Sequence, residues 1–156
     1  MMKSESAQKL EKFIGYTFDN PTFLEDALTR KAFRNENPSL NLGCMDSLAT
    51  LGDSVLGAVV VYRRYENGKQ KKGELTKRKI SGIRRERTRA FADRNKLSRF
   101  VHWGNGELKQ KSQAESDKAL DAVTEALIGA VFLDAQKRGW NGMDVIEKML
   151  ERMNFF

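Results

Sequence analysis

The stretch MDSLATLGDSVLGAVVVYRRY, residues 45–65, decides the fold of this chain of 156 residues. Its middle, LGDSVLGAVVVY, is apolar at almost every position, so a helix formed by it must be buried on all sides. A second stretch of this kind, ALDAVTEALIGAVFLDAQ at 119–136, lies within a helix that we expect over residues 117–137. Two buried helices predict an all-α core against which the remaining helices pack.

The remaining apolar residues recur at helical spacing, and no stretch alternates as a strand would. Pro21 is well placed at the first position of a helix capped by Asn20 or Asp19. Asn141 or Trp140 is expected to open the final helix. The other expected elements are helices at 6–14, 21–33, 74–82 and 83–95, and a polar loop at 34–43. The sequence therefore predicts one all-α domain of about seven helices over residues 1–156.

The composition excludes several kinds of site. The single cysteine, Cys44, allows no internal disulfide and no Cys-rich zinc site, and it fits a reducing compartment. The single histidine, His102, rules out a metal site built on three histidines. No apolar run approaches the length of a membrane span, and the N-terminus lacks a signal-peptide core. We therefore expect a cytoplasmic protein without membrane segments.

The positive charge is concentrated in the middle of the chain. Residues 63–99 hold fifteen basic and four acidic residues, a net charge of +11, whereas the rest of the chain carries −4. A local excess of this kind favours a polyphosphate partner, that is, a nucleic acid. The alternative is a solvated helical face rich in Lys and Arg.

Two carboxylates interrupt the apolar middles of the expected core helices, Asp53 in the first and Glu125 in the second. A buried carboxylate is costly unless it meets a cation, hydrogen-bond donors or a metal. Asp46 lies two turns before Asp53, and Asp121 lies about one turn before Glu125. Oxygen ligands suit Mg²⁺, so the pattern suggests a metal-dependent phosphodiester hydrolase; pairing of each acid with a nearby Lys or Arg is the alternative.

Around these acids the chain resembles the ribonuclease III family of double-stranded-RNA endonucleases. Four segments resemble the family in its order: GYTFDNPTFLEDALTRKAF (15–33), MDSLATLGDSVL (45–56), GELTKRKISGIRRERTRA (73–90) and SDKALDAVTEALIGAVFLD (116–134). The resemblance implies an all-helical endonuclease domain that cuts duplex RNA as a homodimer. It also implies a Mg²⁺ cofactor, with Mn²⁺ able to substitute. A two-fold dimer suits a reaction in which each site cuts one strand.

The family's usual metal site is incomplete in this sequence. A Glu four residues before Asp53 and an Asp three residues before Glu125 are both replaced, by Ala49 and Ala122. Asp53 and Glu125 carry over as ligands, and Asp121 is a candidate substitute one residue out of register. The stand-alone mini-ribonuclease III branch also lacks both acids and the RNA-binding domain, yet it is active.

Asp46 matches another acidic position of the signature, shortened from Glu, and we count it with the catalytic candidates. Thr50 replaces the aromatic residue that in the family usually plugs the partner subunit, and we expect no double-stranded-RNA-binding domain within residues 1–156. Two interpretations remain: an endoribonuclease with a reduced acidic site, and a non-catalytic duplex-RNA-binding or ribonucleoprotein subunit. In both, phosphate contacts are expected from basic residues on both sides of the acids: Lys77, Arg78, Arg84, Arg85, Lys109, Lys111 and Lys118.

Overall fold

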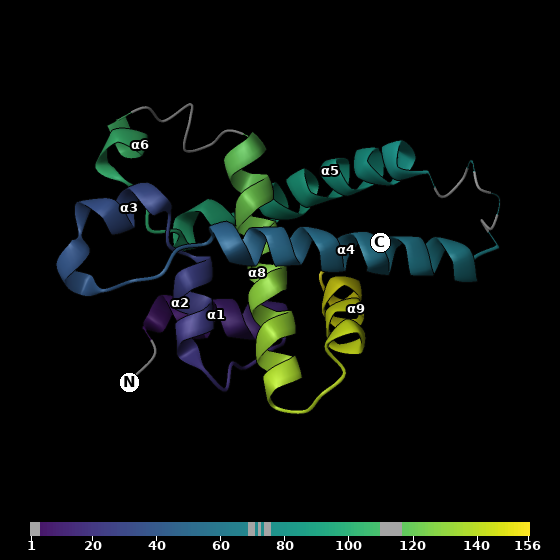
Figure 1. Ribbon diagram of the computed structural model, residues 1–156, viewed down its shortest axis with the longest axis horizontal. Coiled ribbons are helices and arrows are strands. Elements are labelled where there is room, and N and C mark those ends of the chain that lie inside the picture. Colours follow the sequence, from purple (N-terminus) through teal and green to yellow (C-terminus); the bar gives the residue numbers. More distant parts are fainter. Residues whose placement is uncertain (1–3, 69–70, 72, 74–75, 110–116) are drawn as a thin grey trace.

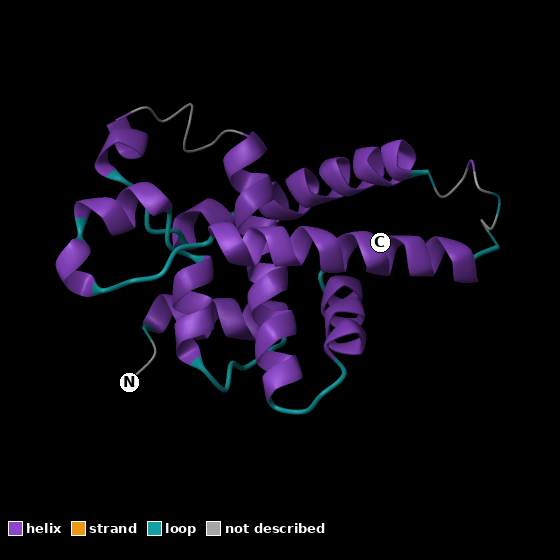
Figure 2. Cartoon of the chain, in the orientation of Figure 1, coloured by secondary structure: helices purple, strands orange, loops and turns teal. Residues whose placement is uncertain are grey.

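The structure is a computed structural model that describes residues 4–68, 71, 73, 76–109 and 117–156. Within this part it consists of helices and loops without strands, which confirms the all-α prediction (Figure 2). The eight α-helices described are α1 Glu5–Ile14, α2 Pro21–Ala27, α3 Lys31–Glu36, α4 Asp46–Glu66, α5 Lys77–Arg94, α6 Asn105–Lys109, α8 Asp117–Lys137 and α9 Gly142–Arg152, with short 3₁₀ turns at Pro38–Leu40 and Leu97–Phe100. No helix in these residues combines the length and the apolar character needed to cross a membrane.

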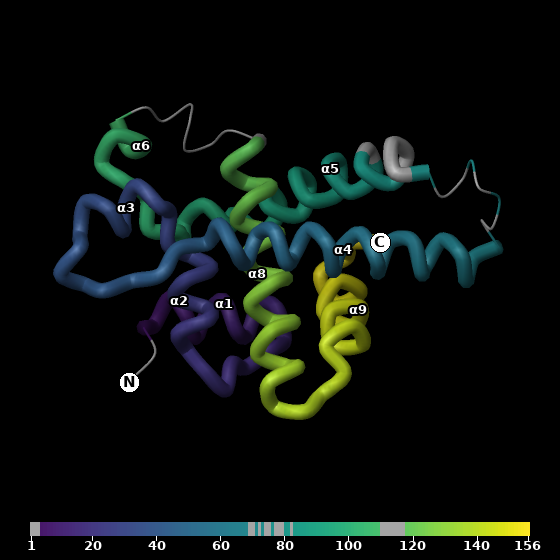
Figure 3. The backbone as a smooth tube through the Cα atoms, in the orientation of Figure 1, coloured from purple at the N-terminus to yellow at the C-terminus, as the bar shows by residue number. Residues whose placement is uncertain are grey.

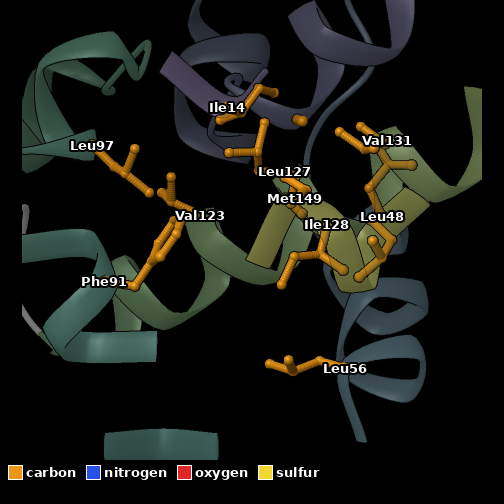
Figure 4. Packing of buried hydrophobic residues seen from close by; sticks show 14 of the residues in the cluster. Ile14, Leu48, Leu56, Phe91, Leu97, Val123, Leu127, Ile128, Val131 and Met149 are labelled. Atoms are coloured by element: carbon orange, nitrogen blue, oxygen red, sulfur yellow. The ribbon is translucent and has the colours of Figure 1, made fainter. Parts of the chain in front are cut away.

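The centre of the fold is the crossing of α4 and α8, the two helices expected to be buried (Figure 1). Their bounds agree with the predicted 45–65 and 117–137 to within one residue. Leu56 of α4 and Leu127, Ile128 and Val131 of α8 are almost completely buried in the core, as Figure 4 shows. α4 buries only one face, however: Leu48, Val55 and Val59 lie in the core, whereas Ser54, Ala58 and Tyr62 are exposed. The prediction that this helix is buried on all sides is therefore wrong, because its small and aromatic side chains on the other face remain in contact with water.

Shorter helices pack around this pair and begin where their caps were predicted. The Asn20 side chain accepts a hydrogen bond from the amide of Thr22 at the start of α2, with Pro21 as the first helical residue. Asn141 does the same for Asp144 at the start of α9. α9 packs against α8 and α4, so the C-terminal helix closes one side of the core.

The basic segment forms one helix instead of the predicted two. α5 runs from Lys77 to Arg94 and continues across the predicted boundary between residues 82 and 83. Gly82, the last residue of the first predicted helix, lowers helix stability by only about 1 kcal/mol, which packing of α5 on α8 and α4 readily offsets. Figure 3 shows α5 returning alongside α4 toward α8. One continuous helix therefore carries the basic run to the middle of the molecule.

The predicted helix over 21–33 is divided into α2 and α3. The chain leaves helical geometry at Thr29, which is completely buried and forms an isolated bridge with His102. The amide of His102 donates to the Leu28 carbonyl at 2.8 Å, and the amide of Arg30 donates to the His102 carbonyl at 3.2 Å. Pairing with His102 thus replaces the hydrogen bonds that a continuous helix would make at these residues. Sequence periodicity could not predict this pairing, because the partner lies far along the chain.

Candidate active site at the crossing of α4 and α8

Two glycines let the backbones of α4 and α8 touch. A Cβ atom built on Gly52 would lie 1.7 Å from the carbonyl oxygen of Glu125. One built on Gly129 would lie 2.1 Å from the carbonyl oxygen of Leu48. Any side chain at these positions would separate the helices. The contact brings Asp53, the residue after Gly52, to the level of Glu125, and so joins the two acids predicted from the sequence.

Asp53 forms an ion pair with Arg84 of α5. One guanidinium nitrogen of Arg84 donates to the Asp53 carboxylate and also to the Asp53 main-chain oxygen, the latter at 3.0 Å. The second terminal nitrogen of Arg84 lies 3.3 Å from the Ser81 hydroxyl. The Arg84 side chain is 17% exposed, whereas that of Asp53 is 51% exposed. The Asp53 carboxylate is therefore open to solvent on one side, whereas the guanidinium that neutralises it is largely covered by protein.

Asp121 of α8 is held by α5, the helix that also carries Arg84. The Thr88 hydroxyl donates to its carboxylate at 2.8 Å, and Arg89 Nε lies 3.8 Å from the other carboxylate oxygen. Thr88 is 2% exposed, so its hydroxyl is fixed by packing on α8. Thr88 was not among the residues predicted for the site, because a lone hydroxyl in an arginine-rich run carries no distinctive signal.

The pKa of Glu125 is raised by its surroundings. Burial, with the negative charges of Asp53 and Asp121, raises its pKa from 4.5 to about 7, and the Arg84 cation opposes this rise. The charges of Asp53 on α4 and Asp121 on α8 thus both act on Glu125. Their mutual repulsion is the condition that a bound cation relieves.

The donor chemistry of Asp53, Asp121 and Glu125 fits a hard divalent cation, which prefers carboxylate oxygens. In the described residues, however, no three acidic, His or Cys side chains converge closely enough to form a metal site as they stand. Protein groups, chiefly Arg84, supply the positive charge in this arrangement. Closure around an ion would require the acids to turn from α5 toward one another.

Asp46 stands apart from these three acids. It is the first residue of α4, is exposed, and is not among the charges that shift the pKa of Glu125. Ala49 and Ala122 are partly buried and pack against the core. Thr50 is exposed, and its hydroxyl donates to the Asp46 carbonyl at 3.2 Å. The structure thus brings together three of the four predicted catalytic residues.

The predicted RNA-contacting residues lie in different settings. Arg85 on α5, Lys109 at the end of α6 and Lys118 in the first turn of α8 are exposed. Arg84 instead places its guanidinium on Asp53. Lys111 lies outside the described residues, as do the side chains of Lys77 and Arg78 in the first turn of α5.

Sequence reasoning also missed a buried acid that serves the fold. Asp134 of α8 is 2% exposed and accepts hydrogen bonds from the Tyr16 hydroxyl at 2.6 Å and the amides of Asp19 and Asn20 at 3.0 and 2.9 Å. Burial and the Asp134 contact raise the pKa of Tyr16 to about 12. An Asp near the end of an apolar helix was the available signal, and its role is to anchor the start of α2.

Comparison with known proteins agrees with this architecture. The Ribonuclease-III-like family model matches residues 20–152. Ribonuclease 3 of Lactobacillus acidophilus is 34% identical over 154 residues, which cover 96% of this chain and 63% of that protein. Ribonuclease 3 of Streptococcus thermophilus is 31% identical over 149 residues, 94% of this chain and 61% of that protein. The chain thus spans about three fifths of the length of the curated relatives it matches.

Solved structures match over nearly the whole chain. The nuclease domain of ribonuclease III from Campylobacter jejuni superposes with a TM-score of 0.75 at 27% identity and covers 97% of this chain and 94% of that domain. A second structure of that domain, described for flexibility in a region involved in dimer formation, gives the same TM-score at 26% identity and covers 94% of both chains. By sequence and by fold, the chain belongs to the ribonuclease-III-like family.

Proposed function

We propose that this chain is a Mg²⁺-dependent endoribonuclease that cuts double-stranded RNA as a homodimer. The observation that carries the proposal is the grouping of Asp53, Asp121 and Glu125 at the α4–α8 crossing, next to the basic helix α5. Carboxylates beside a cationic surface suit hydrolysis of a polyanion, because the cations bind the phosphates and the acids hold the catalytic ion. The family to which the chain belongs supports the same reaction.

Asp53, Glu125 and Asp121 are the residues that would hold the ion, while Asp46 stands apart from them as the first residue of α4. When bound, Mg²⁺ supplies Lewis-acid stabilisation of the phosphate and lowers the pKa of a water molecule. The protein's own part is to orient the carboxylates: the glycine contact sets the spacing of α4 and α8, and Thr88 fixes Asp121. In this proposal, three acids hold the ion in place of the family's usual larger set.

RNA binding is assigned to the exposed basic residues on either side of the acids. Arg85, Lys109 and Lys118 are exposed and belong to three different helices. Such side chains contact phosphates, so affinity should depend strongly on salt and weakly on sequence. The homodimer is proposed because two strands need two sites, and dimer formation is described for the Campylobacter jejuni nuclease domain. The single cysteine suits the cytoplasm as the site of action.

The second candidate function is a non-catalytic duplex-RNA-binding or ribonucleoprotein subunit. The observation that favours it is the ion pair between Arg84 and Asp53, at a site that also has Ala49 and Ala122 in place of the family's acids. An acid neutralised by an arginine is not available to a metal ion until the arginine leaves. This candidate retains the basic surface and the dimer but not strand scission.

A cleavage assay separates the two functions. The purified chain is incubated with a long, end-labelled RNA duplex and Mg²⁺, and strand scission is followed by denaturing electrophoresis. Asp53→Asn and Glu125→Gln should each reduce cleavage by about 100-fold or more. The control is Asp93→Asn, which changes an exposed acid of α5 and should leave cleavage unchanged. Duplex binding without scission by the unmodified chain would instead establish the second function.

A further inference from the structure

The guanidinium of Arg84, on α5, makes directed contacts with Asp53 of α4, and the Arg84 side chain is only 17% exposed. A terminal guanidinium nitrogen bridges the carboxylate and the main-chain oxygen of Asp53, and the other terminal nitrogen contacts Ser81. The Nε atom is buried and has no hydrogen-bond partner among the described residues. The side chain is therefore fixed by the pairing with Asp53, with little help from solvent.

The guanidinium lies against the surface of α4. A Cβ atom at Gly57, one turn after Asp53, would make an ordinary van der Waals contact with the same terminal nitrogen at 3.4 Å. From this position the cation contacts Asp53 and also acts on Glu125, because it opposes the rise in the pKa of Glu125 that Asp53 and Asp121 cause. Arg84 thus supplies positive charge to Asp53 and Glu125, two of the acids that a metal ion in the site would bind.

A guanidinium and a divalent ion are poor neighbours on one carboxylate. Both require the Asp53 oxygens, and at contact distances in a half-buried site their charges repel strongly. The guanidinium also has a flexible stem by which it can leave, whereas the carboxylate is close to the helix backbone. Binding of an ion at Asp53 is therefore coupled to release of Arg84.

We infer that Arg84 is a positioning residue of the acidic site, which holds Asp53 in the absence of metal and competes with a divalent cation for it. Arg84 thereby sets the metal affinity of the site. The inference deepens the proposed function, since it rests on the same acids binding Mg²⁺, but it makes its own prediction about binding. Arg84, which was expected to contact RNA phosphates, is thereby assigned to the acidic site instead.

The test is a calorimetric titration of the full chain with MnCl₂, without RNA. Arg84→Gln should lower the dissociation constant for Mn²⁺ by about tenfold, because the competing charge is removed. Arg85→Gln is the matched control: it removes the same charge from the next residue of α5, which is exposed, and should change the constant by no more than about twofold. Arg84→Lys, which keeps the charge but not the planar pairing, should fall between them.

Two results would overturn the inference: an Arg84→Gln variant, folded by circular dichroism, that binds Mn²⁺ no more tightly than the unmodified chain, or no binding by any variant. A second measurement needs no substitution. In a nuclear magnetic resonance titration with Mg²⁺, the Nε–H signal of Arg84 should shift as Asp53 is released, and an unchanged signal at saturation would also overturn it.

The cleavage assay keeps this outcome separate from the proposed function. Tighter Mn²⁺ binding by Arg84→Gln in a chain that never cuts RNA would support the role of Arg84 while rejecting the nuclease. Normal Mg²⁺-dependent cutting by the unmodified chain, with equal Mn²⁺ affinities of the unmodified and Arg84→Gln proteins, would retain the nuclease and reject competition by Arg84.

Discussion

Replacing Gly52 by alanine tests the contact on which the acidic site depends. The new Cβ atom would start 1.7 Å from the Glu125 carbonyl oxygen, and real Cβ atoms are essentially never closer than 3.0 Å to such an atom. The helices must therefore move apart by about 1.3 Å or more, the difference between these two distances. Because the obstacle is main chain inside α8, no side-chain rotation relieves the clash.

The cost follows from the packing around the crossing. Overpacking of a core costs about 1–3 kcal/mol, and the upper end applies where backbone opposes backbone. A gap of roughly 1 Å also removes up to half of the dispersion energy at neighbouring contacts such as those of Leu48 and Val55, which adds about 1 kcal/mol. The better helix propensity of alanine returns about 1 kcal/mol. We expect Gly52→Ala to lower the free energy of unfolding by about 3 kcal/mol.

Urea unfolding followed by far-ultraviolet circular dichroism measures this loss. With a urea dependence of about 2 kcal/mol per molar, the midpoint should fall by roughly 1.5 M. Gly57→Ala on the same helix is the matched control: its nearest neighbour would be an arginine nitrogen at an ordinary 3.4 Å, so it should be neutral or stabilising by up to about 1 kcal/mol. Equal midpoints for the two variants would refute the backbone contact.

Three further predictions concern individual side chains. In metal-free buffer, Glu125→Gln should raise the free energy of unfolding by about 1–2 kcal/mol near pH 8 but not near pH 4, since an acid whose folded pKa is about 7 costs stability as pH rises from 4.5 through 7; equal gains at both pH values would contradict this. Contact with Glu25 raises the pKa of His102 and lowers that of Glu25. Their pair therefore stabilises the fold below pH 6.5 and stops doing so as pH rises through the raised His102 value, so His102→Gln should flatten the melting temperature between about pH 6 and 9, and an unchanged slope would count against it. Asp134→Ala should cost about 3 kcal/mol in urea unfolding, because it leaves three donors without their acceptor, and a loss below about 1 kcal/mol would show that the network is dispensable.

The sequence was most informative where one physical effect dominates. The bounds of α4 and α8 follow from their apolar composition, and the starts of α2 and α9 from Asn20 and Asn141 as caps. The break at Thr29 could not be predicted in the same way, because it depends on pairing with His102, 73 positions along the chain. Local periodicity contains no information about such a partner.

The candidate site was likewise predictable from the sequence only in part. Asp53 and Glu125 were identifiable because a carboxylate in an apolar helix needs a compensating partner. Which partner they have depends on how α5 docks, and in a run with Arg84, Arg85, Arg87 and Arg89 the sequence does not distinguish the arginine that turns inward. Only the packing of α5 on α8, with Thr88 buried between them, selects Arg84 for Asp53.

Charge balance relates the missing acids to Arg84. When ionised, Asp53, Asp121 and Glu125 carry three negative charges, and Arg84 and Arg89, which pair with Asp53 and Asp121, carry two positive charges, so the group has a net charge of −1 without any bound ion. A cluster with the family's two further acids and no arginine would be far more repulsive and would depend on metal to fold stably. Pairing of Asp53 with Arg84 would reduce that dependence. It follows that Mg²⁺ should raise the melting temperature of the Arg84→Gln variant more than that of the unmodified chain, because ligand-induced stability grows with affinity. A nuclease with Arg84 in place would then need its arginine displaced during each binding of metal, whereas an RNA-binding subunit would keep it.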